Sequence, residues 1–225
     1  FWISALSQLA CVVISLGLRE PAHAGRHTAN IYAHLRDALG QFFTNRRLRL
    51  LSLASILSYG IGESAWMFRS VFNALFWPVW ALGLAQTVSN VGAATSFYLS
   101  GRLIRRFKEI NLLLAGELCS RAANLIALLV PTVVSPALMT TSSMMFGVSR
   151  VSENNLFQKE FSDSQRATMA SLNSLSGNLF FGVFAIGLGA AADAWGPILA
   201  LLAAELLMLL VTVIYLRLYF RHTSR

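Results

Sequence analysis

The sequence predicts an all-α integral membrane protein, a polytopic helical bundle of about seven transmembrane helices. Of its 225 residues, 56% are hydrophobic and only 12% are charged, whereas soluble domains carry roughly 25% charged residues. The apolar residues also gather in long runs, and a membrane-spanning helix needs about 20 of them. A surface with so few charges cannot face water over most of its area, so the lipid bilayer is the first expected partner.

The first half of the chain contains three such runs. The run at 1–18, FWISALSQLACVVISLGL, carries no charge. A signal peptide would open with a basic segment, which this run lacks, so we expect a transmembrane helix of a longer protein. The run at 49–69 is weakest near its end, where Glu63, Trp66 and Arg69 interrupt it. The run at 78–101 follows Pro78 and stops at the basic segment GRLIRRFKEI.

Four more runs complete the predicted bundle, at 110–130, 134–157, 167–192 and 197–218. The stretch 180–192 is rich in glycine, which permits close helix contact or bending. The predicted organisation is a helix at 1–18, a connection at 19–48, a six-helix bundle at 49–220 and a tail at 221–225.

Lysine and arginine mark every second connection. Fifteen of the eighteen basic residues lie in 19–49, in 101–110, in 158–166 and after 216, while the connections 70–77, 131–133 and 193–196 contain none. Basic loops stay in the cytoplasm, so we expect these connections and the tail on the cytoplasmic side of the plasma membrane. The net charge of +8 is therefore explained by basic residues in cytoplasmic connections, and we expect no nucleic acid partner.

The connection at 19–48 contains TANIYAHLRDALGQFFTNRR, in which Ile31, Leu35, Leu39 and Phe42 recur at helical spacing. This pattern predicts an amphipathic helix on the cytoplasmic membrane surface, although a helix that merely links two bundles fits equally well. Cys11 and Cys119 lie in separate apolar runs and predict neither a disulfide framework nor a metal site. Without a phosphate-binding loop, nucleophile elbow or zinc motif, we expect no enzymatic activity and no cofactor.

Polar residues recur at steps of three or four along three of the predicted helices, so each set shares one helix face. Such stripes could line an aqueous path, although serine and threonine are also common where membrane helices pack closely. Glu63 is the best candidate for proton or cation coupling, because Tyr59 and Trp66 flank it at about one turn. The candidate cavity residues are Ser55, Tyr59, Glu63, Trp66, Gln86, Asn90 and Asn178.

Other charged residues fall inside the predicted spans, where a charge is costly. Glu117 and Arg121 are one turn apart, which predicts a self-contained structural ion pair. Glu205 has no partner on its own helix, so it must find one on a neighbour or remain protonated, and we expect a structural or lipid-facing neutral carboxyl there.

The arrangement resembles the second half of a major facilitator superfamily transporter. The family's glycine-led basic loop has a counterpart in Gly101, Leu103, Arg106 and Lys108, with Arg105 where the family has aspartate, and 166–196 resembles its eleventh helix and outer turn. On this resemblance 1–18 is the sixth helix, 49–220 holds helices seven to twelve, and the partner is a missing N-terminal six-helix half.

The resemblance implies secondary active transport of a small solute by alternating access. The protein would be a symporter or an antiporter coupled to H+ or Na+, and proton-coupled efflux is one such mode. It also implies a cytoplasmic gate, for which the candidates are Gly101, Arg105, Arg106, Arg150 and Glu153. Two alternatives stay open: a seven-helix receptor or sensor, and a transporter-like scaffold that does not transport.

Overall fold

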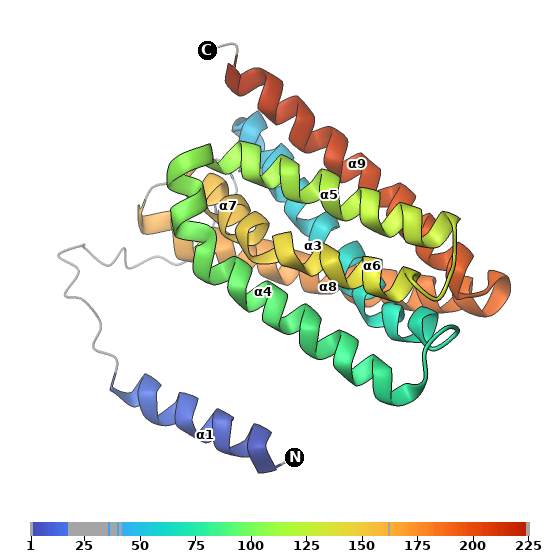
Figure 1. Cartoon of the computed structure of the whole chain (residues 1–225). Coiled ribbons are helices and arrows are strands. Elements are labelled where there is room, and N and C mark those ends of the chain that lie inside the picture. Colours follow the sequence, from blue (N-terminus) through green and yellow to red (C-terminus); the bar gives the residue numbers. More distant parts are fainter. Residues whose placement is uncertain (1, 18–35, 37–39, 41, 162, 224–225) are drawn as a thin grey trace. The chain divides into compact units, whose positions relative to one another are not determined.

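The computed structural model describes residues 2–17, 36, 40, 42–161 and 163–223 (Figure 1). The chain divides into two compact units, 1–34 and 35–225. The described part of the first unit is the helix α1 (Trp2–Leu16). Most of the predicted surface helix at 19–48 lies outside the described residues.

The second unit is entirely helical in its described part. Its elements are α3 (Arg46–Asn73), α4 (Val79–Phe107), α5 (Glu109–Leu129), α6 (Ser135–Thr141), the 3₁₀ turn η1 (Ser142–Met145), α7 (Phe146–Gln158), α8 (Asp163–Trp195) and α9 (Pro197–Thr223). Helix α3 packs against α8 and α9, and α5 packs against α7 and α9.

Helix α3 is longer than the sequence predicts at both ends. It starts at Arg46 because the Asn45 side chain accepts hydrogen bonds from the backbone N–H groups of Arg47 and Leu48, at 3.0 and 3.1 Å. Glu63, Trp66 and Arg69 do not interrupt it, since it continues to Asn73.

The predicted helix at 134–157 is broken in the structure into α6, η1 and α7. Three hydroxyl groups in a row bond to backbone carbonyls one turn back: Thr141 to Leu138, Ser142 to Met139 and Ser143 to Thr140. Such bonds compete with the regular helical pattern, and the chain tightens into the 3₁₀ turn at this point.

The connections between helices gather at two ends of the second unit (Figure 1). At one end Arg47 pairs with Glu160 at 3.1 Å, and Lys159 pairs with Glu109 at 2.6 Å, so the start of α3, the α4–α5 turn and the α7–α8 connection lie together. At the other end the Trp77 indole donates a hydrogen bond to the Val133 carbonyl at 2.7 Å. The basic connections therefore share one end, and the uncharged ones the other.

The outer surface of this unit is apolar along whole helix faces. On α8, Leu175, Leu179, Val183 and Ile186 follow one another at steps of four, four and three and are each more than half exposed. Monomeric soluble proteins rarely expose continuous apolar surfaces of this extent, so the stripe is consistent with contact with lipid.

Three described helical segments are long and apolar enough to span a membrane: Glu109–Leu129, Arg166–Trp195 and Pro197–Phe220. Helices α3 and α4 are long enough, but their mean hydropathy is lowered by the polar side chains described below. The structure thus supports a helical membrane protein, on the length and composition of these three segments.

Close helix contact depends on Gly147, at the start of α7. A Cβ atom at this position would overlap the backbone nitrogen of Phe97 on α4. By contrast, a Cβ at Gly182 on α8 would meet nothing within 4 Å.

We expect Gly147→Ala to lower the free energy of unfolding by about 1–3 kcal/mol, because α4 and α7 must move apart. The matched change Gly182→Ala is expected to leave stability unchanged or raise it by up to about 1 kcal/mol. Unfolding of both variants in detergent micelles, followed by circular dichroism, measures the difference. Equal stability of the two variants would contradict the close α4–α7 contact.

Candidate functional site

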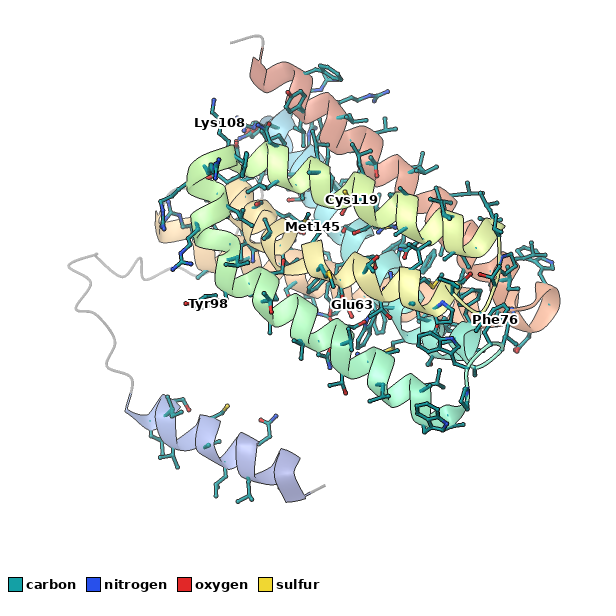
Figure 2. The ribbon with its side chains drawn as sticks, in the orientation of Figure 1. Glu63, Phe76, Tyr98, Lys108, Cys119 and Met145 are labelled. Carbon is teal, nitrogen blue, oxygen red and sulfur yellow. The ribbon has the colours of Figure 1, made fainter. Side chains whose placement is uncertain are left out.

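A cavity of about 290 Å³, partly open to the surface, lies in the second unit between α3, α4, α5, η1, α7 and α9. In Figure 2 Glu63, one of the residues that line the cavity, lies between the end of the bundle marked by Phe76 and the end marked by Lys108. The other polar residues on its wall are Ser58, Tyr59, Trp66, Arg69, Ser89, Asn90, Glu117, Ser120, Arg121, Ser142, Ser143, Ser149, Arg150, Glu153 and Glu205.

The periodicity of α3 places three of these side chains on one face. Tyr59, Glu63 and Trp66 are separated by four and three residues, which stacks them on successive turns, and all three line the cavity. Across it, α5 contributes Glu117 and Arg121, again one turn apart. The cavity is therefore bordered by polar helix faces, while the apolar faces point outward.

A buried network joins α5 to α9 at the cavity wall. Glu205 is only 4% exposed, and its two carboxylate oxygens accept hydrogen bonds from Arg121 Nη1 at 2.5 Å and from Asn124 Nδ2 at 2.8 Å. Arg121 also lies 3.7 Å from Glu117. The predicted Glu117–Arg121 pair is thus not self-contained, because Arg121 bridges two carboxylates and its shorter contact is with Glu205.

Arg69 of α3 extends the same network. Its Nη2 donates to Asn124 Oδ1 at 3.3 Å, and its Nη1 donates to Ser142 Oγ at 3.2 Å and to the Met139 carbonyl at 3.5 Å. Asn124 is fully buried and relays between Arg69 and Glu205, accepting from one and donating to the other. These contacts fix five elements of the bundle to one another: α3, α5, α6, η1 and α9.

A second cavity, of about 220 Å³, shares Tyr59, Arg150 and Glu153 with the first. Arg150 Nη1 bonds to Glu153 at 2.8 Å, and its guanidinium lies 5.5 Å from the centre of the Tyr59 ring. The Tyr215 hydroxyl donates to the other Glu153 oxygen at 2.8 Å. Tyr59, Arg150 and Glu153, which border both cavities, form a partition between them.

The second cavity is lined by neutral polar side chains besides the partition. They are Ser55, Asn154, Gln158, Asn173 and Ser174. Asn173 donates to Ser55 Oγ at 3.1 Å, and its own amide oxygen is buried without a hydrogen-bond partner among the described residues. Asn154 and Gln158 belong to the last turns of α7, next to Lys159, so this cavity lies on the side of the basic connections.

The structure brings together some of the predicted cavity residues and separates others. Tyr59, Glu63, Trp66 and Asn90 line the first cavity, and Ser55 and Tyr59 line the second. Gln86 and Asn178 line neither one; Gln86 donates to Asn90 at 3.2 Å, and Asn178 accepts from the Tyr59 hydroxyl at 3.0 Å.

The predicted gate residues fall into two groups. Arg150 and Glu153 lie in the partition, whereas Gly101, Arg105 and Arg106 are exposed at the end of α4. Within the described part of the chain, neither Arg105 nor Arg106 forms an ion pair with Glu153, and Arg106 lies instead over the Phe107 ring.

Three residues of the network had no assigned site role from the sequence: Arg69, Asn124 and Glu205. Glu205 gave a signal, because a carboxylate among leucines requires a partner on another helix. Of its two expected settings, structural or lipid-facing, the structure shows the structural one, since Glu205 is buried against α5. Asn124 and Arg69 gave no such signal in the sequence, because their partners lie 81 and 55 residues away.

A double-mutant cycle tests the coupling between Arg121 and Glu205. Glu205→Gln leaves Arg121 with the more distant Glu117 alone, and we expect it to cost about 3 kcal/mol or more of unfolding free energy. The double variant with Arg121→Gln is expected to be more stable than the sum of the single effects by about 1–3 kcal/mol. Thermal and denaturant unfolding in micelles provide the measurement.

The exposed pair Lys159–Glu109 is the matched control. The Lys159 side chain is 61% exposed, and exposed pairs are worth about 0–1 kcal/mol. The same cycle with Lys159→Gln and Glu109→Gln should therefore give a coupling energy below about 1 kcal/mol. Equal coupling energies for the two pairs would refute a special role for the buried network.

The geometry provides a cavity with charged and polar groups on a partly apolar wall, in a bundle with an apolar exterior. No cluster of three metal-ligating side chains occurs among the described residues. Comparison with known proteins found no matching family model, no matching curated protein and no matching solved structure.

Proposed function

We propose that the chain is the second half of a secondary active transporter that moves a small solute by alternating access, as in the major facilitator superfamily. The observation that carries the proposal is the first cavity, with its charged lining, inside helices whose outer faces are apolar. Ligand sites in proteins are concave cavities with a few convergent polar groups, and transporters place them midway along the membrane spans.

In this proposal α1, α3, α4, α5, the α6–α7 segment, α8 and α9 are the seven spans, in the plasma membrane. The end that carries Arg47, Lys108 and Lys159 faces the cytoplasm together with the tail, following the positive-inside rule. The grouping of these connections at one end of the bundle supports this orientation.

The partition of Tyr59, Arg150 and Glu153 is the proposed gate. It separates the first cavity from the second, which lies on the side of the basic connections. A solute that crosses the bundle must displace the Arg150–Glu153 ion pair or the Tyr59 ring. Alternating access requires one such barrier to open only when another is closed.

Several polar side chains outside the network support a missing N-terminal six-helix half as the partner. Trp66, Gln86, Asn90 and Asn178 are all exposed on the surface of this chain, although polar groups in contact with lipid are costly. A second bundle in contact with these side chains would provide further hydrogen-bond partners or enclose water. We assign coupling to H+ or Na+ to Glu63, a carboxylate that lines the first cavity.

Cysteine labelling in sealed vesicles tests the orientation. With Cys11 and Cys119 replaced by serine, we expect Lys108→Cys to react with a membrane-impermeant maleimide only from the cytoplasmic side. Val133→Cys, in an exposed connection at the other end, is expected to react only from the outside. Labelling of both positions from the same side would overturn the proposed spans, and a reversed pattern would overturn the orientation.

Flux measurements test transport itself. The protein encoded by the complete reading frame that contains this sequence is expected to show saturable, gradient-driven flux of a labelled solute in proteoliposomes, abolished by a proton or sodium ionophore. The 225-residue chain alone is expected to show none. Arg150→Gln should change the flux at least several-fold by weakening the partition, whereas Arg102→Gln, on the exposed face of α4, should not. Equal flux in the unmodified complete protein, in Arg150→Gln and in Arg102→Gln would exclude the gate.

A further inference from the structure

Seven ionisable side chains of Asp, Glu, Lys or Arg type line the first cavity. Three are cationic, Arg69, Arg121 and Arg150, and four are anionic, Glu63, Glu117, Glu153 and Glu205. With all of them ionised, the cavity wall carries a formal excess of one negative charge. The identity of the excess carboxylate determines which ligand the cavity attracts.

Six of the seven groups balance one another. Arg150 pairs with Glu153 at 2.8 Å. Arg121 contacts both Glu205 and Glu117, which leaves one further negative charge in that group. Arg69 supplies the matching positive charge, because Asn124 connects its guanidinium to Glu205 through two hydrogen bonds.

Glu63 is the seventh group. It forms no hydrogen bond and no ion pair with any described residue. Arg150 interacts with it only as a longer-range charge, while its own ion pair is with Glu153. A half-buried carboxylate whose oxygens accept no hydrogen bond from the described residues can bind a cation without giving up a contact within the protein.

Two aromatic residues flank Glu63 on the same face of α3. The Tyr59 ring is already occupied by the Arg150 guanidinium, and its hydroxyl is bonded to Asn178. The Trp66 ring has no ring or cation contact within the described residues and lines the cavity one turn from Glu63. Indole is the best aromatic partner for a cation.

We infer that the cavity binds a small organic monocation with an aromatic or aliphatic body, its cationic group at Glu63 and beside the Trp66 ring. The cavity volume of about 290 Å³ lies at the low end of ligand sites, so the ligand is small. The inference rests on the proposed function only in taking this ligand to be the transported solute.

Organic anions and zwitterions fit this wall less well. The available cation for a carboxylate would be Arg69, but three acceptors already hold its guanidinium, and Glu205 balances its charge. An anion would therefore compete with an existing buried network, whereas a cation at Glu63 displaces no protein contact.

Binding can be measured on the 225-residue chain, because both residues assigned to the cationic group, Glu63 and Trp66, belong to it. We would reconstitute the purified chain in lipid nanodiscs and follow the binding of labelled benzyltrimethylammonium by equilibrium dialysis. Benzenesulfonate and benzyl alcohol serve as the anionic and neutral ligands of similar size. We expect saturable binding of benzyltrimethylammonium and at least tenfold weaker binding of the other two.

Substitutions then locate the site. Glu63→Gln is expected to weaken binding of the cation about tenfold or more, while Glu63→Asp retains it within a few-fold. Trp66→Leu should weaken it by about two- to thirty-fold, through loss of the cation–aromatic contact. Glu109→Gln, in the exposed pair with Lys159, is the control and should bind as the unmodified chain does. If Glu63→Gln does not fold by circular dichroism, Glu63→Asp and Trp66→Leu decide.

The outcomes separate this inference from the proposed function. Absence of cation binding, or cation binding that Glu63 and Trp66 substitutions leave unchanged, overturns the inference. Flux of benzenesulfonate or benzyl alcohol by the complete protein, without flux of the cation, would retain transport and overturn the ligand class. Glu63-dependent binding without any flux would retain the cation site and overturn transport.

Discussion

Glu205 shares its two oxygens between Arg121 and Asn124, and the arrangement of the bundle depends on this contact. A carboxylate buried in an apolar helix is tolerated only when its charge is paired and its oxygens accept hydrogen bonds. Asn124 then holds Arg69, and Arg69 holds Ser142 in the 3₁₀ turn. The electrostatic requirement of one carboxylate on α9 thereby fixes the positions of α5, α3 and η1 around the cavity.

The cavity exists because the helices turn their polar residues toward the interior of the bundle and their apolar residues toward the outside. The apolar faces of α8 and α9 point outward, and the serines and charged residues of α3, α5 and α7 point inward. Hydrogen bonds inside the bundle satisfy polar groups that lipid cannot satisfy. Close helix contact adds to this arrangement, since Gly147 brings α7 against the backbone of α4.

The partition between the two cavities combines three kinds of contact on the same few atoms. Glu153 accepts from Arg150 and from Tyr215, and Arg150 also lies over the Tyr59 ring. Because each contact depends on the others, displacement of Arg150 would leave a buried carboxylate with a neutral donor alone.

Periodicity and composition determined the helical class, the positions of most helices and the face of α3 that carries Tyr59, Glu63 and Trp66, because these depend on residues within a few turns of one another. They did not determine the break at Ser142–Met145 or the start of α3 at Arg46, where side chains bond to the backbone. The partners of Arg69, Asn124 and Glu205 were decided only by the tertiary structure. A charged residue in an apolar helix predicts that a partner is needed. Which residue becomes that partner depends on how the helices pack, because the polar residues that could pair with it are distant in sequence.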